Sequence, residues 1–113
     1  MTKIKFFKKQ DMFCGYELSG HTGYADNGED ILCSAISSLT QGVALGITKV
    51  CNIRATIVRD EDNGYLKVEL PKTINDNELQ KVQVLFETLY ISIKDLMVGY
   101  SNYISMEVIG NVY

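Results

Sequence analysis

Two segments of this chain repeat apolar residues at steps of three and four, and this pattern limits the possible folds most strongly. The first segment covers residues 29–48 and the second follows Asn75. Their stripes consist of Leu32, Ile36, Leu39, Val43 and Ile47, and of Leu79, Val82, Phe86, Leu89 and Ile93. Each stripe predicts a helix with one core-facing side. Two such helices need a common apolar surface to cover.

The rest of the chain supplies that surface as strands. Apolar and polar residues alternate in residues 12–19, 53–59 and 66–70, and residues 3–8 and 103–109 are also typical of strands. Asn63-Gly64 predicts a tight turn inside a hairpin. We therefore expect an α+β fold in the order ββαββαβ. Two helices would pack on one face of a mostly antiparallel sheet of about five strands.

Composition sets the class of protein. The chain has 113 residues, of which 46% are hydrophobic, and a net charge of -3. This length and apolar content predict one globular domain over residues 1–113, with a true core. The negative charge argues against direct nucleic-acid binding. We expect no membrane-spanning helix, on the reasoning that charged residues interrupt every apolar run of the chain. We also expect no secretory signal, because no long apolar stretch follows the basic residues near the start.

Cysteine usage points to a reducing compartment. Three cysteines is an odd number, and no secretory signal is expected, so we predict a cytoplasmic protein without a disulfide framework. No Cys-x-x-Cys pair occurs and there is one His, which argues against a zinc site. No phosphate-binding glycine motif occurs either, so neither metal nor cofactor is expected. Cys14 and Cys51 follow apolar neighbours and are interpreted as core residues.

The third thiol, Cys33, lies where chemistry is possible. It falls in the first turn of the first predicted helix, whose cap is Asn27 or Asp30. His21 follows the end of a predicted strand, and a loop containing Gly23 and Gly28 joins the two. The positive end of the helix dipole favours a thiolate, and free backbone N–H groups there can bind an oxyanion. His21 and Cys33 are thus a candidate base and nucleophile.

Other interpretations of the same residues stay open at this point. A cysteine on a helix is usually a core residue, and a histidine near a turn is usually solvated. The carboxylates of Glu29 and Asp30 either oppose ionisation of Cys33 or orient His21. Ser37 lies one turn after Cys33 on the same helix face, so that face is not purely apolar.

The segment around these residues resembles a known family. The run Gly20-His21-Thr22-Gly23-Tyr24-Ala25, followed by Gly28-Glu29-Asp30-Ile31-Leu32-Cys33-Ser34-Ala35-Ile36-Ser37, is similar to the signature of the bacterial ribosomal-processing cysteine proteases, called Prp. The similarity continues through Thr40-Gln41-Gly42-Val43-Ala44-Leu45-Gly46. Thr22 and Ser34 stand where the family often has Ala, and neither change removes a reacting group.

The resemblance implies a specific activity. Members of this family are cytoplasmic homodimers that remove an N-terminal extension from a large-subunit ribosomal protein, cutting after a hydrophobic motif with paired phenylalanines. The resemblance makes His21 and Cys33 catalytic and ties Asp30 and Ser37 to activity. It makes Gly20, Thr22, Gly23, Tyr24 and Gly28 part of a mobile substrate loop. Its implied partner is the ribosomal protein precursor, with no membrane or direct nucleic-acid contact.

Two other function classes are kept beside this one. The first is a non-catalytic module that associates with ribosomes or dimerises, in which Cys33 is buried. The second is a small thiol hydrolase that acts on non-peptide acyl substrates. The position of the Cys33 sulfur relative to the His21 imidazole separates the first of these from the enzymes.

Overall fold

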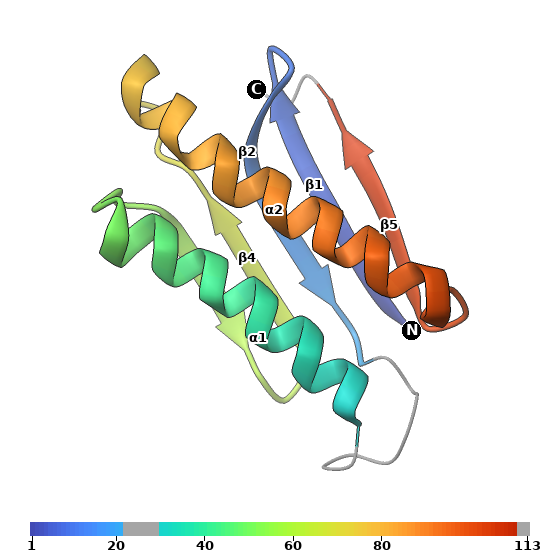
Figure 1. Ribbon diagram of the computed structural model, residues 1–113. Coiled ribbons are helices and arrows are strands. Elements are labelled where there is room, and N and C mark those ends of the chain that lie inside the picture. The colour runs from blue at the N-terminus through green and yellow to red at the C-terminus, as the bar shows by residue number, and fades with distance from the viewer. Residues whose placement is uncertain (22–29, 111–113) are drawn as a thin grey trace.

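A computed structural model describes residues 1–21 and 30–110 of the chain. The elements follow the predicted order ββαββαβ. They are β1 (Thr2–Lys9), β2 (Met12–Ser19), α1 (Ile31–Leu45), the π-helical turn η1 (Gly46–Val50), β3 (Thr56–Asp60), β4 (Tyr65–Glu69), α2 (Asp76–Tyr100) and β5 (Ile104–Ile109). Figure 1 shows α1 and α2 lying beside each other across one face of the sheet. The predicted α+β architecture is confirmed.

The sheet has the strand order β3-β4-β2-β1-β5. β1 pairs with β5 in parallel, and the remaining neighbours are antiparallel. Residues of β4 that face the helices, such as Leu66 and Val68, are buried, whereas Lys67 and Glu69 on the other face are half-buried. This alternation is expected of a sheet with only one covered side.

A bulge in β2 changes the predicted alternation of that strand. Phe7 pairs with Gly15 but Lys8 pairs with Phe13, so Cys14 is the extra residue. The shift allows both Phe13 and Tyr16 to enter the core. The side chain of Gln83 on α2 accepts a hydrogen bond from the Phe13 N–H and donates one to the Phe13 carbonyl, both at 2.8 Å. One polar side chain therefore fixes α2 to the irregular part of β2.

One helix end and one strand start differ from the predicted boundaries. α2 begins after the cap Asn75 as expected, but it continues through Gly99 to Tyr100, so Gly99 does not end it. α1 begins after Asp30, which settles the choice between Asn27 and Asp30 as cap. Beyond η1 the chain turns at Asn52, whose φ is 55°, and Ile53 is buried before β3 begins at Thr56. The strand predicted over 53–59 therefore starts three residues later.

The core lies between the sheet and the two helices. Aromatic rings dominate the part under α2, where Phe6 contacts Phe13, Tyr16 and Tyr90 with centroid separations of 5.4–6.1 Å. The other part of the core contains Ile36 and Ala44 of α1 and Ile47 of η1. The buried Tyr16 hydroxyl donates to the carbonyl of Thr40 on α1 at 2.6 Å. This bond ties α1 to the central strand β2.

The segment Ile31–Val50 is long and apolar enough to cross a membrane by length and composition alone. The expectation that charges interrupt every apolar run is wrong here, since Lys49 is its first charged residue. Core helices of globular domains pass the same test. Here Leu32, Ile36 and Ile47 of this segment are buried against the sheet, so the structure uses its apolar stripe to cover the core.

Candidate active site

His21 stands directly beyond the end of β2. Gly20 adopts a φ of +87°, and a Cβ there would lie 2.7 Å from the carbonyl oxygen of Met1, so only glycine fits this corner. The buried Thr2 hydroxyl donates to the Gly20 carbonyl at 3.2 Å. The start of β1 thus holds the backbone that carries His21, while the imidazole itself is exposed.

Cys33 is the third residue of α1. The Asp30 side chain caps this helix, with Oδ1 accepting from the Cys33 N–H at 2.9 Å. Side chains in a helix tilt toward its N-terminus, so the sulfur points back toward the cap. The Cys33 Sγ lies 3.7 Å from His21 Nδ1. The structure therefore brings together the two groups that the sequence singled out as nucleophile and base.

The other nitrogen of His21 meets the turn between β3 and β4. His21 Nε2 lies 3.2 Å from the main-chain carbonyl oxygen of Asp62. The β2–β4 register explains the contact, because Leu18 pairs with Leu66 and two further steps bring Gly20 opposite Gly64. The sequence identified the Asn63-Gly64 turn but gave no indication that it faces His21.

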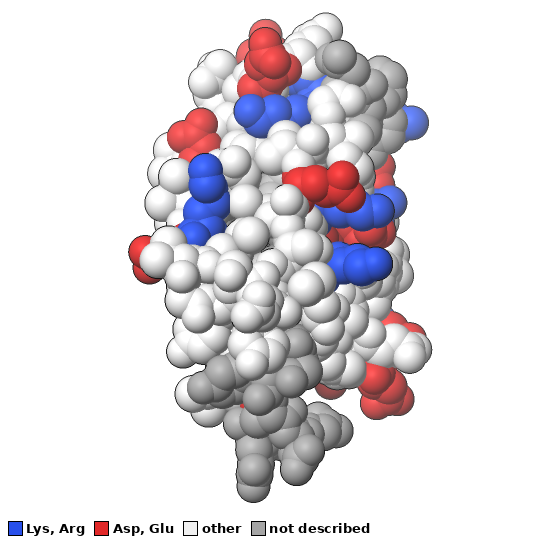
Figure 2. Space-filling model, turned by 90° about the vertical axis from the view of Figure 1, so that its right-hand side faces the viewer, with Lys and Arg blue, Asp and Glu red and all other residues white. Residues whose placement is uncertain are grey.

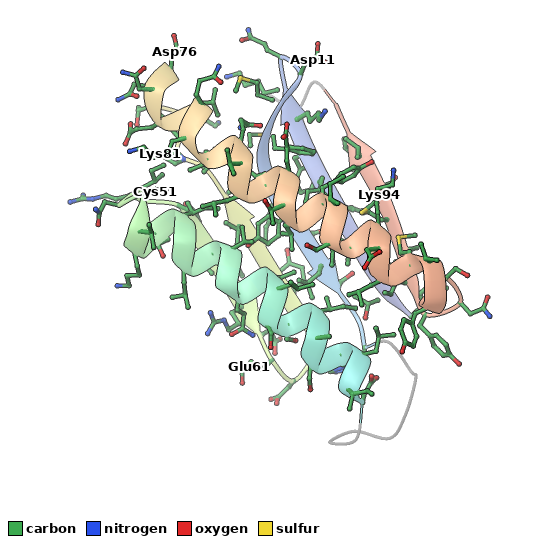
Figure 3. The ribbon with its side chains drawn as sticks, in the orientation of Figure 1. Asp11, Cys51, Glu61, Asp76, Lys81 and Lys94 are labelled. Atoms are coloured by element: carbon green, nitrogen blue, oxygen red, sulfur yellow. The ribbon has the colours of Figure 1, made fainter. Side chains whose placement is uncertain are left out.

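A groove of about 520 Å³ opens at this end of the molecule. His21, Asp30, Cys33 and Ser37 line one part of it. Its apolar surface includes Leu18, Ile36 and Leu66, and Arg59 and Glu61 supply charge from the hairpin. Sequence reasoning missed the hairpin residues, which come from β3, the turn and β4. In Figure 3 the labelled Glu61 marks that turn, at the same end as the start of α1.

The predicted site residues divide into two groups. His21, Cys33, Asp30, Ser37 and Gly20 lie around the groove. Thr22, Gly23, Tyr24 and Gly28 fall outside the described residues, as does Glu29. Asp30 serves as the helix cap, and the main-chain contact to His21 Nε2 comes from Asp62.

The three thiols occupy different surroundings. Cys33 is half-buried and lines the groove, which disfavours the interpretation of it as an interior residue. Cys14 and Cys51 are also half-buried. Cys51 packs against the core as interpreted, whereas Cys14, the bulge residue of β2, is not part of the core cluster. Burial raises the pKa of the Cys14 thiol, the nearby Glu69 carboxylate raises it further, and Lys9 opposes both.

Within residues 1–21 and 30–110, no cluster of three His, Cys, Asp or Glu side chains could hold a metal ion.

The surface shown in Figure 2 carries both signs of charge. Basic and acidic side chains lie near one another in the upper half of this face, whereas a broad uncharged area and a few acidic side chains lie below. Where charges of both signs are intermixed in this way, their long-range fields largely cancel.

Comparison with known proteins extends the description of the site. The family described as "Cysteine protease Prp" matches residues 1–105 of the chain. The ribosomal processing cysteine protease Prp of Bacillus subtilis is 24% identical over 87 residues, covering 77% of this chain and 78% of that protein. The corresponding protein of Staphylococcus aureus is 24% identical over 89 residues, covering 79% and 80%.

Solved structures share the fold. A crystal structure from Streptococcus mutans has a TM-score of 0.83 and 27% identity, covering 97% of this chain and 95% of that one. A crystal structure of Prp from S. aureus, in complex with a covalently linked product peptide, has a TM-score of 0.84 and 20% identity over 96% and 99%. Because the family match covers nearly the whole chain and the fold agrees, the chain belongs to the cysteine protease Prp family.

Proposed function

We propose that this chain is a cysteine endopeptidase that removes the N-terminal extension of a large-subunit ribosomal protein during ribosome assembly. The observation that carries the proposal is the 3.7 Å separation between His21 Nδ1 and Cys33 Sγ at a groove of about 520 Å³. This volume lies within the ordinary range for ligand sites. Membership of a family named for ribosomal processing supplies the substrate class.

The proposed reaction proceeds through a thioester. His21 Nδ1 accepts the Cys33 thiol proton, and the thiolate attacks the scissile carbonyl carbon to form a tetrahedral oxyanion. Collapse of this intermediate breaks the C–N bond, and the imidazolium returns its proton to the leaving amine. Water then attacks the thioester while His21 takes one of its protons. The C–S bond breaks, His21 returns that proton to the leaving thiolate, and the product leaves as a carboxylate whose remaining proton goes to solvent. The covalently linked product peptide in the S. aureus relative is consistent with a covalent step.

The cap of α1 limits which amides can stabilise the oxyanion. Asp30 Oδ1 already accepts from the Cys33 N–H, and the Asp30 carbonyl accepts from the Ser34 N–H at 3.2 Å. Ile31 and Leu32 supply the other amides of this turn, and an N–H at those positions has no acceptor within the helix. We assign oxyanion stabilisation to these two amides. The Cys33 N–H donates to Asp30 Oδ1 and so is not available to bind the oxyanion; this hydrogen bond instead fixes the Cys33 backbone.

The groove suits an extended apolar peptide. Leu18, Ile36 and Leu66 provide an apolar surface, while Ser37 and Gln41 on α1 offer polar groups along one side. A hydrophobic extension with paired phenylalanines would gain binding energy from the apolar area that it covers. A second solved structure of the S. aureus relative contains a substrate peptide.

We further propose that the enzyme acts in the cytoplasm as a homodimer. Sedimentation analysis of the purified protein tests the dimer.

The function is tested by incubating the protein with the extended ribosomal protein and weighing the products by mass spectrometry. The parent protein should release the extension, and Cys33→Ala should not. Cys51→Ala is the matched control, because Cys51 is a half-buried thiol at the opposite end of α1 (Figure 3), away from the groove. It should cleave at the parent rate.

Two outcomes would contradict the proposal. Cleavage by Cys33→Ala at the parent rate would remove the thiolate mechanism. Hydrolysis of small acyl esters without any cleavage of the ribosomal precursor would instead indicate a thiol hydrolase for non-peptide substrates. Neither outcome depends on the dimer proposal.

A further inference from the structure

We propose that the β3–β4 turn, Asp60–Gly64, positions the catalytic base by holding His21 through the main-chain carbonyl of Asp62. The turn would act as the third member of the site, in the place that a side-chain carboxylate or amide takes in many hydrolases. This inference rests on the function proposed above, because it assigns a role to His21 as the base.

The geometry fixes which ring nitrogen carries the proton. A carbonyl oxygen has no proton to give, so the 3.2 Å contact with Asp62 requires His21 Nε2 to be the donor. In a neutral imidazole the other nitrogen then carries the lone pair. That nitrogen is Nδ1, which lies 3.7 Å from Cys33 Sγ. The turn thereby selects the tautomer that can accept the thiol proton.

Hydrogen bonds inside the turn keep the carbonyl in place. The Asp60 carboxylate accepts from the Asn63 side-chain amide at 2.6 Å and from the Asn63 N–H at 3.4 Å. The Gly64 N–H donates to the Glu61 carbonyl at 3.1 Å. These bonds connect the residues before Asp62 with the residues after it. They therefore fix the direction of the Asp62 carbonyl, whereas the Asp62 side chain is exposed.

The turn also packs directly on the segment that carries the histidine. Gly64 has a φ of +61°, and a Cβ there would lie 2.9 Å from the Gly20 carbonyl oxygen and 3.2 Å from His21 Cε1. A Cβ atom essentially never lies as close as the first distance, and the second is tighter than most. A glycine at position 64 is therefore needed both for the turn and for the close approach to the imidazole.

A main-chain acceptor differs from a carboxylate in its effect on the base. It orients the ring but brings no full negative charge to stabilise the imidazolium. The charged residues that line the same groove are Asp30 at the start of α1 and Arg59 and Glu61 of the hairpin. The turn should therefore act on the orientation and the tautomer of His21.

The first measurement uses the fact that His21 is the single histidine of the chain. Protein labelled with ¹⁵N-histidine gives two ring nitrogen signals, which distinguish a protonated from an unprotonated nitrogen in the neutral ring. Cys33→Ala is the suitable background, because it removes any proton exchange with the thiol. We expect only the Nε2–H tautomer there, and a mixture of both tautomers when Asp60→Ala is added.

The second measurement is kinetic and uses the parent thiol. Loss of one orienting hydrogen bond is expected to lower kcat about fivefold in Asp60→Ala, with KM changed by less than about twofold. Asp60→Asn keeps a side-chain oxygen that can accept from Asn63, so it should restore most of the rate. Gly64→Ala should lower kcat at least as much. Gly99→Ala is its matched control, since a Cβ at Gly99 meets no atom within 4 Å.

The outcomes separate this inference from the proposed function. If cleavage requires His21 and Cys33 but Asp60→Ala and Gly64→Ala keep both the tautomer and the parent kcat, the positioning role is wrong and the protease stands. A predominant Nδ1–H tautomer in the Cys33→Ala background would also overturn it. If Cys33→Ala still cleaves, the function fails, and the tautomer measurement then describes only a structural contact.

Discussion

Helices α1 and α2 both begin at a residue whose side chain accepts a hydrogen bond from the N–H three positions later. In α1 the pair is Asp30 and Cys33, with a distance of 2.9 Å. In α2 the pair is Asn75 and Glu78, with a distance of 2.8 Å. Both bonds satisfy an amide that the helix itself leaves without an acceptor.

The residue at the third position distinguishes the two helix starts. The Glu78 carboxylate returns to accept from the Asn75 N–H at 3.4 Å, which completes a capping box. The Cys33 side chain tilts in the same direction along its helix but reaches His21 instead. The side chain of the third residue therefore completes the helix cap in α2 and contacts His21 in α1. The difference depends on the type of that residue and on which other segments of the chain lie near the helix N-terminus.

The surroundings of the two helix starts differ accordingly. Figure 3 shows Asp76, the first residue of α2, at the opposite end of the molecule from the hairpin marked by Glu61. The start of α1 faces that hairpin and the end of β2, which bring His21 and the carbonyl of Asp62 within reach. The start of α2 borders a smaller cavity of about 180 Å³, whose lining includes Asp76 and Leu79. The larger groove of about 520 Å³, with His21 and Cys33 in its lining, lies at the start of α1.

The largest expected effect comes from making the two helix starts alike. Cys33→Glu would give α1 the capping-box pattern of α2, with Asp30 as cap and a carboxylate at the third position. Cleavage of the ribosomal precursor should fall by on the order of 10⁴-fold or more, because the nucleophile is gone. Thermal unfolding should show a midpoint at or above that of the parent protein. A large drop in the midpoint would mean that Cys33 has a packing role.

Removing the cap from each helix in turn should separate stability from activity. Asp30→Ala and Asn75→Ala should each lower the free energy of unfolding by about 1 kcal/mol, measured by urea denaturation. Only Asp30→Ala should also slow cleavage, by on the order of tenfold, because it frees the backbone that carries the sulfur. Asp30→Asn, which keeps a capping oxygen, should recover the stability. Equal cleavage by both alanine variants would contradict the difference between the two helix starts.

Thiol labelling of the native protein compares the reactivity of Cys33, at the start of α1, with that of a thiol elsewhere in the chain. At neutral pH, iodoacetamide followed by peptide mapping should modify Cys33 at least about tenfold faster than Cys14. Burial raises the pKa of Cys14, and Glu69 adds to the shift, so little of that thiol is ionised. In urea the two rates should converge. Faster labelling of Cys14 in the native state would count against a reactive helix start.

The smallest expected effect concerns the bond that holds α1 to the sheet. Burial raises the pKa of Tyr16 well above its ordinary value of 10.0, so the folded protein keeps this hydroxyl protonated where the unfolded chain loses the proton. Its contribution to stability is complete below pH 10 and is lost as the pH rises beyond that value. The free energy of unfolding should therefore fall with increasing alkalinity.

Tyr16→Phe tests this assignment. It removes the 2.6 Å bond to the Thr40 carbonyl and should lower the free energy of unfolding at pH 7 by about 1 kcal/mol. It should also make the alkaline part of the stability curve flatter than that of the parent protein. Parallel curves for the two proteins above pH 10 would show that another group causes the decline.

Much of the fold could be predicted because its signals are local. The two helical stripes, the Asn63-Gly64 turn and the Asn75–Glu78 cap each depend on residues a few positions apart, and all were located correctly. The predicted end at Gly99 was one residue too early, because α2 continues to Tyr100, whose side chain packs against the core. The bulge at Cys14 was missed because it depends on how β1 pairs with β2.

The sequence by itself determined the order of the elements and singled out one imidazole and one thiol as candidates for a common site. These features follow from hydrophobic period and from hydrogen bonding near helix ends, which act within a few residues. Only the tertiary structure decided that the Asp62 carbonyl, 41 residues from His21, contacts its ring and that the hairpin completes the groove. Such contacts depend on strand order and register, which juxtapose distant segments through the packing of the whole sheet.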